Sequence, residues 1–172
     1  MIGGLSMAYR NKIYVSMDAD NDLKYYRLMQ AWKQNDNVYF DFQDAHDINN
    51  IYDKSEESIK AGLQERFRNT KVFVLLVGDH TKYLYKYVRW EIEQAIKREL
   101  PCIVVNINGM RSCDYDRCPA LMRDHLAIHI SFNARIMQYA LETWPASAER
   151  KRKSGERGAY YYKDEVYKKL GL

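Results

Sequence analysis

An unbroken apolar run limits the possible folds of this chain more than any other part of the sequence. It covers residues 72–77, Val-Phe-Val-Leu-Leu-Val. A short, valine-rich run of this kind predicts a strand that is buried on both faces. A polar break at residues 78–81 ends the run, and a helical pattern follows to about residue 99, where Pro101 stops it. A doubly buried strand that leads into a helix is typical of a parallel sheet covered by helices.

The same strand-then-helix alternation recurs along the chain. We expect strands at residues 12–15, 38–42, 72–77, 102–107 and 126–131, and further helices at residues 23–32, 55–67 and 133–143. Right-handed crossovers between such strands give a doubly wound parallel α/β sheet. The expected strand order is 2-1-3-4-5, as in flavodoxin-like folds.

The length of 172 residues suits one domain with terminal extensions. We expect an N-terminal extension at residues 1–10 and the α/β domain at residues 11–145. The region 146–172 is expected to hold a charged connector up to residue 158 and a short helix at residues 160–170. Hydrophobic residues make up 47% of the chain, which indicates a globular body rather than a disordered one.

The formal net charge of +4 is modest, and much of the excess lies in one basic run at residues 150–153. Such a run is typical of a solvated segment, and no base-reading or amphipathic pattern accompanies it, so we expect neither nucleic acid nor membrane as a partner. No secretory signal is recognisable near the start, and the three cysteines fit reduced thiols. These features predict a cytoplasmic protein.

Candidate site residues gather where the first and third strands end. Because these strands are expected to be neighbours, the loop that carries Ser16 and Asp18 should face the helix that carries Glu91. Glu91 lies roughly 85° from the centre of the apolar stripe of its helix, at the shoulder between core and surface. Tyr87 lies one turn earlier on the same side. Asp44, in the loop after the second strand, is a further plausible ligand contact.

The run Tyr87-Val88-Arg89-Trp90-Glu91-Ile92, together with the strand before it, an opening strand with Ser16 in its loop, and a later strand ending Asn106-Ile107-Asn108, resembles the TIR-like proteins of the bacterial Thoeris anti-phage defence system. The resemblance implies that Glu91 acts in cleaving the nicotinamide–ribose bond of NAD+. It also implies that Tyr87 or Trp90 stacks on the substrate and that Ser16 or Asp18 binds its hydroxyls. Many relatives have Trp at the position of Tyr87.

The resemblance further implies a signalling role. The ADP-ribosyl group would become a cyclic ADP-ribose isomer or be joined to a small acceptor such as histidine, and the product would activate a separate effector protein. A phage-derived activator and self-association are also expected. NAD+ would be a consumed substrate rather than a cofactor, since the chain has neither a Gly-x-Gly-x-x-Gly nor a Walker loop. The alternative is a non-catalytic TIR-like interaction module.

Cys113-x4-Cys118 followed by His125-x3-His129 contains the ligand types of a zinc site. The six residues between the two pairs are few compared with the usual spacing of about a dozen, and His129 falls in an expected strand. The pattern therefore favours free thiols and no metal.

Overall fold

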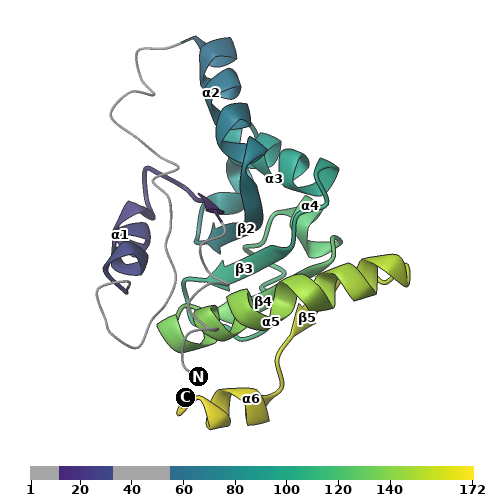
Figure 1. Cartoon of the computed structure of the whole chain (residues 1–172). Coiled ribbons are helices and arrows are strands. Elements are labelled where there is room, and N and C mark those ends of the chain that lie inside the picture. The colour runs from purple at the N-terminus through teal and green to yellow at the C-terminus, as the bar shows by residue number, and fades with distance from the viewer. Residues whose placement is uncertain (1–11, 33–54) are drawn as a thin grey trace, which may run out of the picture.

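A parallel sheet of five strands forms the centre of the molecule in the computed structural model, which describes residues 12–32 and 55–172 (Figure 1). Every neighbouring pair of strands is parallel, which confirms the predicted α/β class. The first, third, fourth and fifth of the strands expected along the chain lie next to one another in the sheet in that order, as predicted. Their order in the sheet is β1 (Lys12–Ser16), β2 (Thr70–Val77), β3 (Cys102–Asn106), β4 (Ala127–Ser131) and β5 (Ala159–Tyr161).

The last strand of this sheet departs from the sequence-based expectation. The strand expected at residues 38–42 and the loop with Asp44 lie outside the described residues. At the other edge, β5 pairs with β4 where we expected the start of a helix at residues 160–170. The edge of β4 offers unpaired backbone groups to a tyrosine-rich segment with high strand propensity, and this pairing outweighs the helical pattern. Only α6 (Asp164–Lys169) remains helical there.

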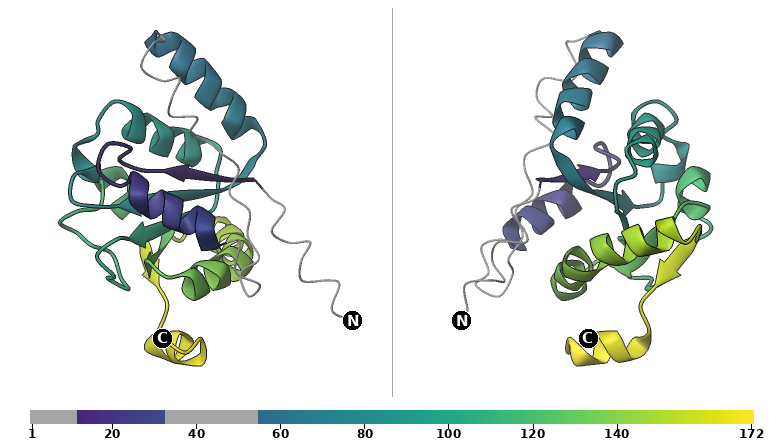
Figure 2. Two further views of the ribbon diagram at one scale, coloured as in Figure 1. Left: turned by 90° about the vertical axis from the view of Figure 1, so that its left-hand side faces the viewer. Right: turned by 45° about the vertical axis from the view of Figure 1, so that its right-hand side comes forward.

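Helices cover both faces of the sheet (Figure 2). One face packs against α1 (Leu23–Trp32) and α5 (Ala134–Lys153), and the other packs against α2 (Glu56–Arg68), α3 (Tyr87–Lys97) and α4 (Ala120–Arg123). Strand β2 supplies both cores because its side chains alternate: Val74 and Leu76 face the first set of helices, and Phe73 and Leu75 face the second. In the part of the chain that is described, no helix is both long and apolar enough to cross a membrane.

Helix α5 continues well beyond the end that we predicted for it at residue 143. Pro145 lies inside the helix and removes one backbone hydrogen bond, at a cost of about 3 kcal/mol. The apolar stripe continues past it, however, and Trp144 and Ala148 are both buried against the sheet. The region expected to be a charged connector is therefore helical up to Lys153.

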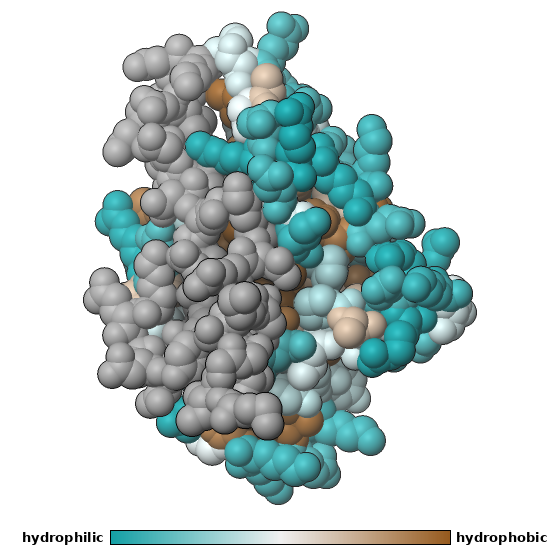
Figure 3. Space-filling view, in the orientation of Figure 1, coloured by the Kyte–Doolittle hydropathy of each residue, from teal (hydrophilic) through white to brown (hydrophobic). Residues whose placement is uncertain are grey.

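The basic run forms the last turn of α5, where positive charge is favourable for the helix dipole. Lys153 pairs with Glu149 and Lys151 with Glu156, so part of the positive charge is balanced locally. The projecting end of this helix is hydrophilic in the space-filling view (Figure 3).

The segment between β2 and α3 forms a compact turn. Gly78 N donates to Thr81 Oγ1 at 2.9 Å, and a short 3-10 helix, η2 (Thr81–Tyr83), follows. The regular helix α3 then begins at Tyr87 and ends at Lys97, close to the predicted end. This turn brings the first turn of α3 to the carboxyl end of β2, next to the loop that follows β1.

Candidate active site

Glu91 lies in the interior, beneath the first two strands and α2. Its side chain belongs to the buried residues of α3 and is only 2% exposed. The sequence pattern predicts a position at the shoulder of the helix, between core and surface. The helical wheel considers only the sheet as a packing partner, whereas α2 covers the shoulder as well, with Leu63 and Phe67 in the same core. The carboxyl group is therefore more buried than the sequence pattern indicates.

The hydroxyl of Ser16 is a polar partner of this carboxyl group. It donates to Glu91 Oε1 at 3.3 Å, and Ser16 itself is fully buried. The contact joins the last residue of β1 to the second turn of α3. The structure thus brings together two of the site residues predicted from the sequence, through the predicted pairing of β1 with β2.

Tyr14 is a site residue that our sequence analysis missed. It precedes Ser16 by two positions in β1, so both side chains point to the same face of the sheet. Its ring stacks on Phe67 with 4.1 Å between centroids, and its hydroxyl and the Glu91 carboxyl group influence each other's pKa. Burial, followed by the charge of Glu91, raises the pKa of the Tyr14 hydroxyl well above its usual value. The period of two along the strand was the signal that could have identified it.

The acidity of Glu91 is set by its burial. Removal from water raises the pKa of the Glu91 carboxyl to about 7. The hydroxyls of Tyr14 and Ser16 and the positive charge of Arg66 act in the opposite direction and lower this pKa. Near neutral pH the carboxyl group therefore exists in both protonation states, and a positive charge placed beside it would favour the carboxylate.

A cavity of about 490 Å³ opens beside Glu91. The loop after β1 and α2 form part of its wall, and the segment from η2 into α3 forms the rest. Asp18, Tyr87 and Glu91, three of the predicted site residues, line it. The volume is within the range of small-molecule sites, which also tend to lie at this edge of open α/β sheets. The full lining is Met17, Asp18, Ala19, Asp20, Ile59, Leu63, Tyr83, Leu84, Tyr85, Lys86, Tyr87, Val88 and Glu91.

The predicted site residues Asp18, Trp90 and Asp44 differ from one another in their surroundings. The carboxylate of Asp18 accepts from the backbone of Asp20 and Asn21 and from the Asn21 side chain, so it shapes the loop that forms the cavity wall. Trp90 is not part of the cavity lining, and its ring meets the ring of Phe67 edge-on at 6.2 Å. Asp44 lies outside the described residues.

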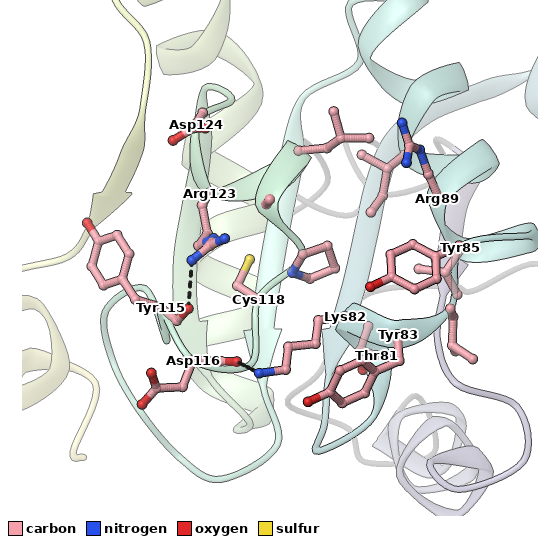
Figure 4. A pocket seen from close by; sticks show the side chains of 16 residues that line it. Thr81, Lys82, Tyr83, Tyr85, Arg89, Tyr115, Asp116, Cys118, Arg123 and Asp124 are labelled. Atoms are coloured by element: carbon pink, nitrogen blue, oxygen red, sulfur yellow. Dashed lines mark hydrogen bonds between the residues drawn. The ribbon is translucent and has the colours of Figure 1, made fainter.

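A second cavity of about 580 Å³ lies on the other side of η2 and shares Tyr83, Leu84, Tyr85 and Val88 with the first (Figure 4). The loop between β3 and α4 forms its far wall, and two basic side chains hold that loop in place. Lys82 Nζ donates to the Asp116 carbonyl at 2.6 Å, and Arg123 donates to the Tyr115 carbonyl at 2.9 Å. The wall is thus tied to η2 and α4 by side chains that bind its backbone.

Residues 14–112 match the family model of the Thoeris protein ThsB, TIR-like domain. The matched segment covers more than half of the chain and includes Tyr14, Ser16 and Glu91 together with the strands that bring them into contact. The chain therefore belongs to the family of Thoeris ThsB proteins with a TIR-like domain.

Proposed function

We propose that this protein is a Thoeris defence enzyme that cleaves NAD+ at the bond between nicotinamide and ribose. The observation that carries the proposal is the buried Glu91 carboxyl group, which accepts a hydrogen bond from Ser16 on β1 and forms part of the wall of a cavity of about 490 Å³. A buried carboxyl group with a raised pKa beside a cavity is typical of a functional site rather than of a structural glutamate.

The proposed reaction breaks the C–N glycosidic bond, and its electron pair leaves with nicotinamide, which becomes neutral. The ribosyl group is left as an oxocarbenium-like cation. In a partly dry cavity a fixed carboxylate stabilises such a cation far more than it would in water. We assign this role to Glu91, with Ser16 and Tyr14 as the groups that orient it. Tyr87 is the proposed stacking partner of a substrate ring, and Asp18 is proposed to bind hydroxyl groups from the cavity wall.

We further propose that the ADP-ribosyl cation is captured to give a signalling nucleotide. Capture within the molecule gives a cyclic ADP-ribose isomer, and capture by histidine gives histidine-ADP-ribose. Either product would activate a partner effector protein. A phage-derived activator would switch on the enzyme, and this chain would self-associate. These partners are proposed from the family to which the chain belongs.

The decisive experiment compares Glu91→Gln with the matched control Glu93→Gln. Glu93 lies on the same helix, but its side chain is 48% exposed and pairs with Arg89. Nucleotides from phage-infected cells that express each variant are measured by mass spectrometry, because the trigger is present there. We expect nicotinamide release and the new nucleotide with the wild type and Glu93→Gln, and neither with Glu91→Gln. Turnover by a folded Glu91→Gln variant would contradict the proposal.

A non-catalytic interaction module is the second candidate, and exposed aromatic side chains favour it. Tyr83 and Tyr85 are 57% and 68% exposed beside the cavity, and Tyr115 is 67% exposed on the far side of the second cavity. Exposed tyrosines are common at protein interfaces. This candidate predicts that Glu91→Gln still protects cells from phage, whereas the double variant Tyr85→Ser/Tyr115→Ser does not.

A further inference from the structure

A cluster of buried sulfur and nitrogen ligands lies apart from Glu91, under the loop between β3 and α4. The sulfur atoms of Cys113 and Cys118 and one ring nitrogen of His129 all lie within 4.8 Å of one another. Ligand atoms around a tetrahedral zinc ion lie roughly 3.5–3.8 Å apart, given bond lengths of about 2.3 Å to sulfur and 2.0 Å to nitrogen. A movement of the side chains by about 1 Å would therefore close the cluster around an ion.

The surroundings of His129 point independently to a ligand. His129 is 0% exposed, and neither ring nitrogen has a hydrogen-bond partner among the described residues. Buried polar atoms without a partner are rare because each one loses its hydrogen bonds to water. An ion bound to one of these nitrogens would satisfy it. His129 lies on β4 in the middle of the sheet, where its neighbours across the strands are Val104 and Tyr161.

The chemistry of the cluster selects the kind of ion. Two thiolates balance the charge of a divalent cation, and a neutral imidazole adds none, so the occupied site would carry no net charge in the core. Sulfur and imidazole ligands prefer zinc over magnesium or calcium, which take oxygen ligands. His125, the other histidine of the sequence motif, is not a member of the cluster. The cluster therefore combines the cysteine pair with a single histidine from the next strand, whereas the sequence motif contains two histidines.

We propose that Cys113, Cys118 and His129 bind one zinc ion, which fastens the loop between β3 and α4 to strand β4. Cys118 also lines the second cavity, together with Arg123 (Figure 4). The ion would hold this wall in place. Three protein ligands leave a fourth coordination position for water or a small molecule.

The test uses the full chain, reduced and freed of metal with a chelator. Cobalt(II) is titrated in first because thiolate ligands give it a charge-transfer absorption and a tetrahedral site gives it intense visible bands. We expect one cobalt ion per chain, a charge-transfer intensity that corresponds to two thiolates, and displacement by zinc together with a rise in Tm. This result depends on the wild type alone, so it holds even if a variant fails to fold.

The variants assign the ligands. Cys113→Ser, Cys118→Ser and His129→Ala should each weaken cobalt binding by at least about tenfold. The matched control is Cys102→Ser, because Cys102 is equally buried in β3 and lies outside the cluster. His125→Ala is the control for the sequence motif. Both controls should bind as the wild type does. The proposal is overturned if reduced wild type shows no thiolate-to-cobalt absorption, or if Cys102→Ser loses it as Cys113→Ser does.

Discussion

The hydroxyl of Ser16 donates a hydrogen bond of 3.3 Å to the carboxylate of Glu91, which lies 75 residues further along the chain. Both groups are buried, so little water is present to replace the bond if it is lost. The bond also favours the ionised form of the glutamate. It therefore couples the end of β1 to the protonation state of the proposed catalytic residue.

Replacing Ser16 by Ala should reduce catalysis without unfolding the protein. A hydrogen bond to a charged group contributes about 1.5–3 kcal/mol, which corresponds to roughly a 10- to 100-fold loss of activity. The pKa of Glu91 should rise further, so the pH profile of kcat/KM should move to higher pH. Measuring that profile separates this effect from a simple loss of folded protein, which would lower the whole curve without moving it.

The Tyr14→Phe variant should keep the fold and change the acidity of Glu91. Phenylalanine preserves the ring that stacks on Phe67, but it removes the hydroxyl that lowers the pKa of Glu91. Activity near neutral pH should fall, and the pH profile should shift upward as in Ser16→Ala. The midpoint of thermal unfolding should stay close to that of the wild type. An unchanged profile would show that Tyr14 has no influence on the carboxyl group.

The pH dependence of stability should reveal the buried carboxyl group. The pKa of Glu91 is raised from 4.5 to about 7 in the folded state, so between these values the folded protein holds a proton that the unfolded chain releases. The free energy of unfolding must then fall as pH rises through this window, by up to about 3 kcal/mol. The Glu91→Gln variant lacks this pH-dependent loss. Its free energy of unfolding, measured with urea, should therefore rise relative to that of the wild type between pH 5 and pH 8. Parallel curves for the two proteins would show that Glu91 ionises normally.

Activity should rise with pH over the same range. The proposed mechanism needs the carboxylate form of Glu91, which becomes the major form above a pKa of about 7. The ascending limb of kcat/KM against pH should therefore have its midpoint near this value. A limb centred near the ordinary glutamate pKa would indicate that the carboxyl group is exposed to water in solution.

Gly78→Ala should destabilise the turn that precedes α3. A Cβ atom at this position would collide with the carboxylate of Asp22, whose pKa is already raised to about 6 by burial, followed by the charges of Asp18 and Asp79. Overpacking of this kind costs about 1–3 kcal/mol, which chemical denaturation can measure. Gly62→Ala is the matched control. Nothing lies within 4 Å of a Cβ there, so alanine in α2 should leave stability unchanged or raise it.

Local sequence patterns were enough to predict the class of the fold and the position of the candidate site along the chain. The apolar run of β2 could only be a strand buried on both faces, and a parallel sheet places the loop after β1 next to the start of α3. The pairing of Ser16 with Glu91 therefore follows from the order of strands and helices along the chain. These inferences hold because strand burial and the handedness of crossovers depend on local patterns that every parallel sheet shares.

Three features of the molecule could not be predicted from these patterns: the depth at which Glu91 is buried, the position of Tyr14 beside it, and the cluster of Cys113, Cys118 and His129. Each of these facts depends on a segment that is distant in sequence: α2 covers the shoulder of α3, and β4 brings a histidine under the loop after β3. The pairing of β5 with the edge of β4 and the continuation of α5 past Pro145 also depend on contacts between distant segments. In these places, packing between segments that are distant in sequence outweighs local propensity. Local sequence patterns do not predict such packing.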